Sequence, residues 1–376
     1  MEYIKIGKIN EYVSQSINPM KTPDTIFEMY SVPVYDTGHP EYLRGDEIAS
    51  SKIVVQKDDI LLCKINPRIN RVWVVNDESD KQNIASSEWI VIRTKTYNPE
   101  YLAWYFRTPN FQKLMTSEVT GIGGSLTRAQ PKRVAEYPVP VLGREKQDEI
   151  VCALNRVKKL IEARKQELQE LDNLIKSRFV ELFGHQSHNE KSMPYLTIDD
   201  VAEIYLGITH TPTYVENGVM FISAKNTSGD FLDLSDVKYI SREEFESAPK
   251  GSKPQINDVL FSRVGSNLGH PVILEEDLEL CTFVSLGFLR TKGNVTSNYL
   301  KHWMRDDFFA KQVSEHVKGG GQPNLNTGWL KEFKIIVPDI ECQREFDDFC
   351  KQVDKLKFFT INYTKLLHKG VNSFGN

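Results

Sequence analysis

Short apolar runs recur in both halves of the chain and have the pattern expected of β-strands. In the first half they cover residues 53–55, 72–75 and 90–92, and in the second half residues 219–223, 259–262 and 283–289. Runs of this length, rich in β-branched and aromatic side chains and bounded by turn residues, favour strands. An aromatic segment with the composition of a short helix follows in each half, at residues 101–115 and 299–313. Each half is therefore predicted to be a compact mixed α/β domain.

Two longer stretches carry the apolar spacing of a coiled-coil seam. Residues 144–183 contain no proline and end at Gly184, and their apolar stripe comprises Ile150, Leu154, Val157, Ile161, Leu168, Leu171, Ile175 and Leu182. The C-terminal stripe comprises Phe346, Phe349, Val353, Leu356, Tyr363, Leu367 and Phe374. Alternating steps of four and three residues predict helices. Because a lone helix would expose such a stripe to water, we expect the two helices to pair as an antiparallel coiled coil.

Polar residues interrupt both stripes. Arg164 and Arg178 interrupt the first, and Thr360 and Gly370 interrupt the second. We expect the two arginines to pair with carboxylates within the coil, although contact with phosphate remains an alternative.

The two halves repeat one another in the same order. Residues 56–65 match residues 255–264, and the Arg-Thr-Lys at residues 93–95 recurs at residues 290–292. A glycine cluster, a proline-ended strand and a long helix then follow in both halves. Ordered landmarks at a nearly constant offset indicate a duplicated architecture. The predicted fold is α+β, with two mixed α/β domains (residues 1–143 and 186–340) in tandem pseudo-repeat, joined by long helices at residues 144–185 and 341–376.

Composition limits the classes of function. The 376 residues carry a net charge of −4, so a nucleic-acid-binding protein of this composition must gather its cations on one face or share the contact with partners. The five cysteines show no C-x-x-C spacing, which favours reduced thiols in a cytoplasmic protein. No uncharged apolar stretch approaches about 18 residues, so we expect no membrane contact.

Candidate catalytic motifs are weak. Asn98-Pro99-Glu100-Tyr101 is the nearest match to an adenine methyltransferase loop, but the second half has Thr296 at the corresponding place, so a helix start explains both. No phosphate-binding G-x-x-x-x-G-K-[ST] motif occurs. His185 and His188 have the spacing of metal ligands, but nothing nearby completes a set. We therefore expect neither a catalytic centre nor a metal site.

Several segments carry a family resemblance that covers nearly the whole chain. They are residues 218–226, 258–266 and 321–326 (Gly-Gln-Pro-Asn-Leu-Asn), with the leads into the helices at residues 144–147 and 341–344. These segments resemble the specificity subunits of type I restriction–modification systems. The first half departs from the pattern, because its glycine loop at residues 123–128 lacks the Gln-Pro-Asn of the second.

The resemblance implies a non-catalytic subunit with two target-recognition domains, each of which reads one half of a bipartite site on double-stranded DNA. It further implies two modification (methyltransferase) subunits and up to two restriction subunits as partners. S-adenosylmethionine, ATP and magnesium would then belong to those partners, with no cofactor in this chain. A helix over residues 150–182 would be roughly 50 Å long at about 1.5 Å per residue and would act as a ruler between the half-sites.

Candidate DNA-contacting residues lie in turn-rich loops, where Arg, Lys, Asn and Gln reach base edges and backbone amides hold phosphates. In the first half they are Lys64, Asn66, Arg68, Asn70, Arg71, Gly123, Gly124, Ser125, Arg128, Lys132 and Arg133. In the second half they are Lys225, Asn226, Arg263, Ser266, Asn267, Gly320, Gly321, Gln322, Asn324 and Asn326. Ordinary solvated loops have similar compositions, so each residue also has a structural explanation.

Two other functions remain open from the sequence. The chain could be a scaffold whose end domains bind peptides or glycans, which would have no salt-sensitive affinity for DNA. It could also be a fragment of a fused restriction–modification enzyme, in which case a methyltransferase sequence would lie upstream in a longer polypeptide.

Overall fold

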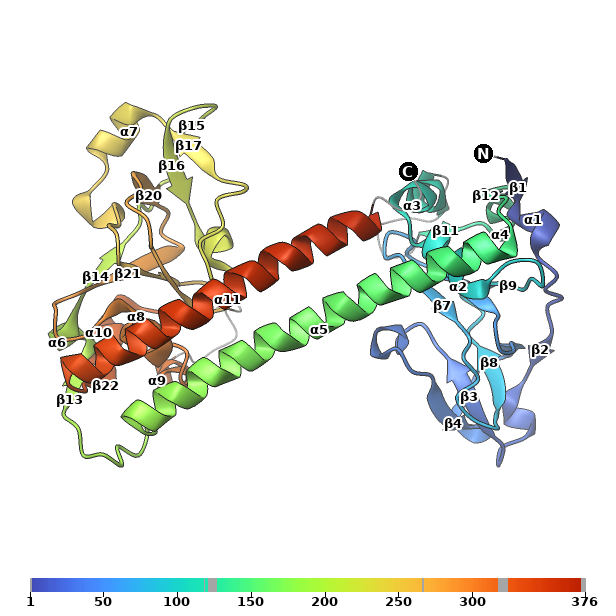
Figure 1. Ribbon diagram of the computed structural model, residues 1–376, viewed down its shortest axis with the longest axis horizontal. Coiled ribbons are helices and arrows are strands. Elements are labelled where there is room, and N and C mark those ends of the chain that lie inside the picture. Colours follow the sequence, from blue (N-terminus) through green and yellow to red (C-terminus); the bar gives the residue numbers. More distant parts are fainter. Residues whose placement is uncertain (1, 118, 121–126, 266, 317–323, 373–376) are drawn as a thin grey trace. The chain divides into compact units, whose positions relative to one another are not determined.

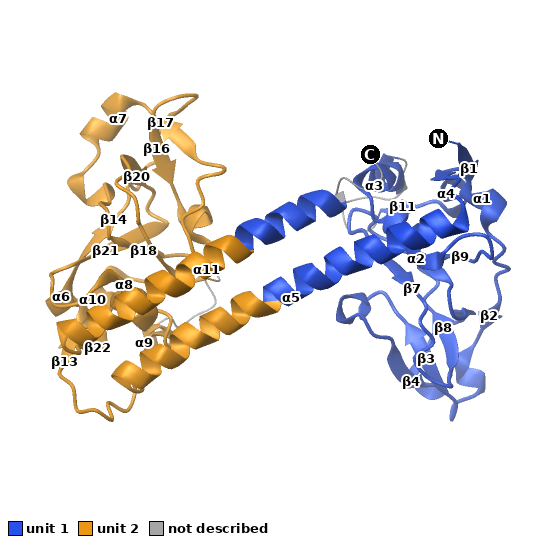
Figure 2. Ribbon diagram, viewed as in Figure 1, with its two compact units in different colours: residues 1–165, 361–376 blue, residues 166–360 orange. Residues whose placement is uncertain are grey.

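The computed structural model describes residues 2–117, 119–120, 127–265, 267–316 and 324–372 (Figure 1). The chain divides into two compact units, shown in different colours in Figure 2. Unit 1 consists of residues 1–165 and 361–376, and unit 2 consists of residues 166–360. Each of the two long helices therefore contributes to both units.

Unit 1 is built on a three-stranded antiparallel sheet whose central strand is β6 (Ile60–Cys63), between β7 (Val72–Val74) and β9 (Trp89–Ile92). Successive side chains of a strand point to opposite faces of the sheet. Ile60 and Leu62 accordingly join one core, with the helices α2 (Pro99–Phe106) and α3 (Pro109–Ser117), whereas Leu61 and Cys63 join another. Because β6 is buried on both faces, it holds the first residues of the following loop in place.

A second sheet and smaller elements complete unit 1. The five-stranded sheet has the order β2 (Ser16–Ile17), β5 (Lys52–Val54), β8 (Gln82–Ala85), β3 (Ile26–Tyr30) and β4 (Glu41–Arg44). The remaining elements are β1 (Tyr3–Lys5), α1 (Ile6–Ile9), η1 (Pro19–Lys21), η2 (Tyr35–Thr37), η3 (Gly45–Glu47), β10 (Val119–Thr120), β11 (Arg128–Ala129), α4 (Pro131–Val134) and β12 (Pro138–Pro140).

Unit 2 contains two four-stranded sheets. The first has the order β14 (Ala202–Leu206), β21 (Leu286–Thr291), β18 (Val259–Ser262) and β19 (Pro271–Ile273), and the second has the order β15 (Tyr214–Val215), β17 (Lys238–Ile240), β16 (Val219–Ile222) and β20 (Leu280–Thr282). The other elements are β13 (Tyr195–Thr197), α6 (Ile198–Val201), η4 (Ala224–Thr227), α7 (Arg242–Ser247), η5 (Lys250–Ser252), α8 (Ser297–Trp303), α9 (Asp307–His316), α10 (Thr327–Glu332) and β22 (Lys334–Ile336). Strand β18 separates two cores as β6 does, with Val259 and Phe261 on one side and Leu260 on the other.

The sequence repeat is also a structural repeat. Strand β1 pairs with β12 through Ile4 and Val139, and β13 pairs with β22 through Leu196 and Ile335, both antiparallel. A glutamine near the start of each long helix makes the same bonds in both halves. Gln147 Oε1 accepts the backbone N–H of Asn98 (2.7 Å), and Gln343 Oε1 accepts that of Thr296 (2.8 Å). These bonds tie each long helix to the domain that precedes it in the chain.

The two long helices are α5 (Arg144–Phe183) and α11 (Ile340–Asn372). Within unit 2, Arg178 of α5 pairs with Glu345 of α11, and Asp172 pairs with Lys357. Arg178 comes later in α5 than Asp172, whereas its partner Glu345 comes earlier in α11 than Lys357. The two helices therefore run antiparallel, as predicted. Within unit 1 the Arg164 guanidinium lies 5.6 Å from the centre of the Tyr363 ring. The predicted pairing of Arg178 with carboxylates is confirmed by its bonds to Glu181 and Glu345.

The seam on α11 differs from the one predicted. Leu356 and Tyr363 were assigned to it, yet their side chains are 55% and 46% exposed. Phe346 and Val353 are buried as predicted, and the other buried positions are Cys350, Lys357 and Thr360, which continue the four–three spacing. Two polar residues therefore occupy the buried stripe, and this is why the apolar pattern alone placed Leu356 and Tyr363 in the seam.

Helix α5 ends as the sequence indicates. Gly184 follows it in the left-handed region (φ 71°) and donates its N–H to Val180 O at 2.7 Å, a common way to end a helix. Among the described residues, no helix is both long enough and apolar enough to cross a membrane.

Candidate nucleic-acid interface

The two predicted loops of the first half lie side by side. The chain leaves β6 at Cys63, and the backbone N–H of Asn66 donates to Thr127 O, while that of Ala129 donates to Lys64 O, both at 2.8 Å. Ile65 and Arg128 form an antiparallel bridge. The segment that follows the first glycine cluster is thereby held against the loop at residues 64–71.

The second half repeats this arrangement. The backbone N–H of Leu325 donates to Arg263 O at 2.8 Å, and Val264 and Asn324 form an antiparallel bridge. The backbone N–H of Arg263 in turn donates to Ser285 O at 2.9 Å, just as that of Lys64 donates to Glu88 O at 3.0 Å. In both halves the fold therefore brings together candidate segments that are about 60 residues apart in the sequence, each anchored on a buried strand.

Candidate side chains of the first half differ in exposure. Arg68 is exposed in the loop, and Lys132 and Arg133 are exposed on α4. Lys64, Asn66, Asn70 and Arg71 are half-buried. Asn70 donates to Phe106 O at 3.3 Å, and Arg128 pairs with Glu88 at 3.2 Å, so these two side chains also hold the loop in place.

In the second half, Arg263 holds the ends of two neighbouring segments. Its guanidinium donates to Val284 O at 3.1 Å and to Leu325 O at 3.4 Å. Desolvation lowers the pKa of Arg263, although a guanidinium of this kind stays charged at neutral pH. Asn324 and Asn267 are exposed. Asn326 is also exposed, but its Oδ1 accepts the N–H of Gly328 at 2.7 Å and caps α10.

The two candidates near η4 have different environments. Lys225 is exposed and pairs with Asp236 at 2.9 Å. Asn226 is only 3% exposed, and its amide accepts the Ser223 N–H and donates to Asp233 O. Because both ends of this amide are used inside the domain, we remove Asn226 from the candidate DNA contacts. Its role is to hold the loop that carries Lys225.

Seven predicted contact residues lie outside the described part of the chain. They are Gly123, Gly124, Ser125, Ser266, Gly320, Gly321 and Gln322.

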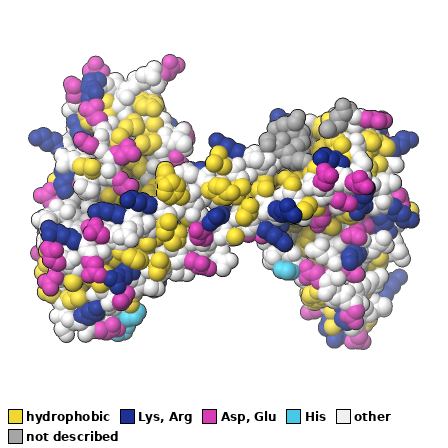
Figure 3. Space-filling model, in the orientation of Figure 1, with side chains coloured by type: hydrophobic (Ala, Val, Ile, Leu, Met, Phe, Trp, Pro, Cys, Tyr) yellow, Lys and Arg dark blue, Asp and Glu magenta, His cyan; other side chains and the backbone are white. Residues whose placement is uncertain are grey.

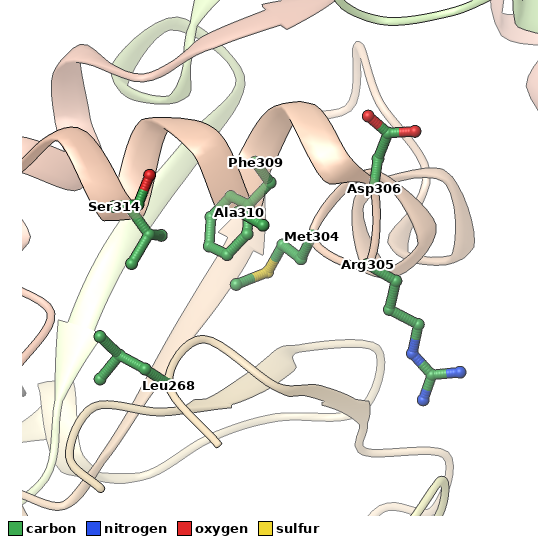
Figure 4. A pocket seen from close by; sticks show the side chains of 8 residues that line it. Leu268, Met304, Arg305, Asp306, Phe309, Ala310 and Ser314 are labelled. Atoms are coloured by element: carbon green, nitrogen blue, oxygen red, sulfur yellow. The ribbon is translucent and has the colours of Figure 1, made fainter. Parts of the chain in front are cut away.

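Gly269, in the chain that follows β18, lies against Phe309 of α9. Gly269 has φ 77°, and a Cβ there would meet the Phe309 ring at 2.6 Å, so this close approach requires glycine. Beside it lies a hollow of about 370 Å³, with Leu268 from the loop and Met304, Phe309 and Ala310 from the helical side (Figure 4). Arg305, Asp306 and Ser314 complete the lining, so apolar and polar side chains both face the hollow.

The groups that the sequence left as weak catalytic candidates have structural roles. Asn98 Oδ1 accepts the N–H groups of Glu100 (2.9 Å) and Tyr101 (3.3 Å), which makes it the N-cap of α2. Thr296 caps α8 in the same way through Tyr299 N. Among the described residues, no group of three or more His, Cys, Asp or Glu side chains could hold a metal ion.

The cysteines are free thiols in the structure. Cys63, Cys281 and Cys350 are buried, and burial raises the pKa of each thiol, to about 12 for Cys350. Raised pKa values leave little reactive thiolate at neutral pH, so these three side chains act as small apolar groups of the cores.

Known proteins resemble this chain in sequence and fold. Residues 190–366 match the family model described as the type I restriction modification DNA specificity domain. A curated relative, the type I restriction enzyme MjaVIII specificity subunit of Methanocaldococcus jannaschii, is 20% identical over 94% of this chain and 86% of its own length.

Two solved structures share the fold over 99% of this chain. One belongs to a study of complex assembly and conformational transition of the type I R-M system, with a TM-score of 0.60, 20% identity and 95% of that chain covered. The other is a type I restriction-modification system S subunit from M. genitalium, with a TM-score of 0.55, 12% identity and 94% covered. These likenesses define the fold class as two mixed α/β domains joined by a pair of long helices.

The domain model matches residues 190–366, and the curated relative extends the similarity to the family of type I restriction–modification specificity subunits over 94% of this chain. Members of this family are non-catalytic subunits that provide DNA recognition, and they generally carry no cofactor. A scaffold for peptides or glycans is accordingly not favoured.

Proposed function

We propose that this chain reads a bipartite target on double-stranded DNA, with the domain at residues 1–143 on one half-site and the domain at residues 186–340 on the other. The observation that carries the proposal is the pair of bridged loops in each domain, Ile65 with Arg128 and Val264 with Asn324. Each pair follows a strand that is buried on both faces, and each presents basic and amide side chains. Rigidly held side chains of these types suit base-edge and phosphate contacts.

The proposed contact set contains the candidates of both halves except Asn226. Arg68, Lys132 and Arg133 in the first half, and Lys225, Asn267 and Asn324 in the second, have exposed side chains suited to direct contact. Arg128, Arg263 and Asn326 already bond within their domains. For these three we propose that positioning of the loops is at least as important as contact with DNA.

We also propose that α11 binds the modification subunits. Leu356, Phe359, Tyr363 and Leu366 are exposed by 55%, 70%, 46% and 63%, and they follow one another at steps of three and four residues. Such steps place them on one face of a continuous helix. Figure 3 shows apolar side chains gathered over the long helices on this face of the molecule. A contiguous apolar patch on a protein surface is typical of a protein–protein contact.

The wider assembly follows from the same proposal. Two modification subunits would use S-adenosylmethionine to methylate adenine, and up to two restriction subunits would use ATP and magnesium. The long helices would set the spacing between the half-sites, and the complex would act in the cytoplasm against foreign DNA. Helix α5, with its 40 residues, is about 60 Å long at roughly 1.5 Å per residue, which suits this role.

A binding experiment separates this function from the scaffold alternative. The chain is co-purified with its modification subunit, and its affinity for a mixed pool of duplex DNA is measured at rising salt concentration. Contacts with several phosphates predict a steep, linear fall of log affinity with log salt. A complex that assembles but shows no salt-sensitive DNA affinity would contradict the proposal.

A further inference from the structure

A network of charges centred on the buried Lys357 joins the second recognition domain to the long helices. Asp230, in the loop after η4, accepts hydrogen bonds from Arg305 Nη2 at 2.9 Å and from Lys357 Nζ. Lys357 lies on α11 with its side chain only 3% exposed, and its Nζ also binds Asp172 of α5 at 2.6 Å. All four residues belong to unit 2. One ammonium group therefore holds a loop of the domain and both helices of the coil.

Asp230 is ionised in this network. Burial raises its pKa, but the positive charges of Arg305 and Lys357 outweigh burial and bring the pKa to about 2. The Asp230 side chain is half-buried, whereas the Lys357 ammonium is only 3% exposed, so loss of Asp230 would remove one of the two carboxylates that balance a buried charge. Salt in the solvent screens such partly buried pairs less than it screens exposed pairs.

The same loop reaches both candidate DNA segments of the second domain. On one side, Asn226 donates to Asp233 O at 2.9 Å and so holds the segment that carries Lys225. On the other side, the ring of His270 bonds to Gly229 O at 2.9 Å, and His270 directly follows the segment with Asn267 and Gly269. Asp230 thus lies at the junction between these two segments and the coil.

The first half has different residues at the corresponding places. Counted from the equivalent glutamines Gln147 and Gln343, Ile161 of α5 takes the place of Lys357. Ala103 takes the place of the buried Lys301, as the surrounding Tyr-Leu pairs show. Trp104 takes the place of His302, and its Nε1 donates to Asn155 on α5 at 3.0 Å. At these places the first domain bonds to its helix through the neutral side chains of Trp104 and Asn155, and α5 carries Ile161 where α11 carries the charged Lys357.

We propose that Asp230 is a positioning residue for the second half-site: by binding Arg305 and Lys357 together, it fixes the loops that carry Lys225 and Asn267 relative to the coiled coil. This inference rests on the proposed function, and it assigns the second domain a charge network whose central lysine has Ile161 as its counterpart in the first half. Loss of the network loosens the two segments together and leaves the first half-site unaffected.

The test uses the whole complex. The wild-type chain and the variants Asp230→Asn and Lys357→Met are each co-expressed with the modification subunit in a methylation-free host, and methyladenine is mapped by single-molecule sequencing. Asp230→Asn keeps the shape of the side chain but removes its charge. We expect discrimination at one or more base pairs of the second half-site to fall on the order of tenfold, about the value of one base contact, with the first half-site unchanged.

Two controls separate positioning from general destabilisation. Glu279→Gln breaks the exposed pair with Arg242 (2.6 Å) in the same unit, and Asn155→Ala removes the bond to Trp104 in the first half. Neither is expected to relax the second half-site. Lys357→Arg keeps the charge and should restore discrimination relative to Lys357→Met. Thermal unfolding of each complex shows whether the variants remain folded at the growth temperature.

The outcomes are distinct. A wild-type complex without a bipartite motif would count against the proposed function itself. A wild-type bipartite motif that Asp230→Asn and Lys357→Met both leave unchanged would overturn the positioning role alone. Equal relaxation of both half-sites in folded variants would also overturn it, because it would indicate a general effect on the subunit.

Discussion

The carboxylate of Asp59 accepts two hydrogen bonds from the guanidinium of Arg93, each 2.7 Å long. Asp258 and Arg290 repeat this two-point pair in the second half, at 3.0 and 2.7 Å. Each aspartate also accepts a hydrogen bond from the backbone N–H of the glutamine three residues before it, Gln56 or Gln255. The residue directly before each aspartate, Asp58 or Asn257, has a left-handed backbone conformation. The pair fixes the turn that leads into β6 or β18, and those strands lead into the candidate DNA loops.

Replacing Asp59 should destabilise unit 1. Its side chain is fully buried, so Asp59→Ala leaves the Arg93 charge without its partner and the Gln56 N–H without its acceptor. We expect the free energy of unfolding to fall by about 3–5 kcal/mol, measured by chemical denaturation. Asp24→Ala breaks the exposed pair with Arg44 in the same unit and should lower the free energy of unfolding far less. Equal effects of the two changes would contradict the structural role of the buried pair.

Arg263→Ala should affect the second half-site alone. The substitution removes the bonds to Val284 O and Leu325 O and thereby frees the segment that bridges to Val264. We expect weaker or relaxed reading of that half-site by about 1–3 kcal/mol, measured by competition between DNA duplexes that differ in one half-site. Equal loss at both half-sites would count against separate reading domains.

The exposed stripe on α11 should govern assembly. Phe359→Ser removes the most exposed of its four side chains without opening a cavity, so the thermal stability of the isolated chain should stay nearly unchanged. The affinity for the modification subunit should fall by about 2 kcal/mol, the typical value for a well-packed interface residue, and titration calorimetry would measure it.

Lys365→Ala, on the same helix but away from the stripe, is the matched control. Unchanged assembly of the Phe359→Ser chain would show that the modification subunit binds elsewhere.

Lengthening the coil should change only the gap in the target. Adding seven residues, about two turns, to α5 within residues 164–175 and a matching seven to α11 retains the helical faces. We expect the spacer to grow by about 3 base pairs, because seven residues add roughly 10 Å to a helix and a base pair occupies about 3.4 Å. Mapped methylation motifs would report the gap and the half-sites separately. An unchanged gap would contradict the ruler role of the helices.

The sequence predicted the features that depend on periodicity and repetition. The matched segments at residues 56–65 and 255–264 form equivalent buried strands, and the long stretches without proline form α5 and α11. The pairing of Asp59 with Arg93 was not evident, because it depends on β6 and β9 lying side by side. Both partners nevertheless fall within repeated segments, and recurrence of a charged pair was a signal that could have indicated them.

Individual side chains were harder to place from sequence. Leu356 and Tyr363 looked like seam residues because they are apolar, whereas the buried positions nearby hold Lys357 and Thr360. A lysine is buried there only because Asp172 and Asp230, distant in sequence, meet it. Asn226 looked like a base contact because its type suits adenine, but its amide closes a loop instead. Tertiary partners decide such roles, and residue type alone does not show them.

The methylation pattern of the wild-type complex shows whether one chain reads two half-sites. The chain and its modification subunit are co-expressed in a host that lacks adenine methylation, and modified adenines are mapped across the genome. We expect two short defined sequences separated by a gap of fixed length and free composition. A complex that purifies intact but methylates one continuous sequence, or none, would contradict it.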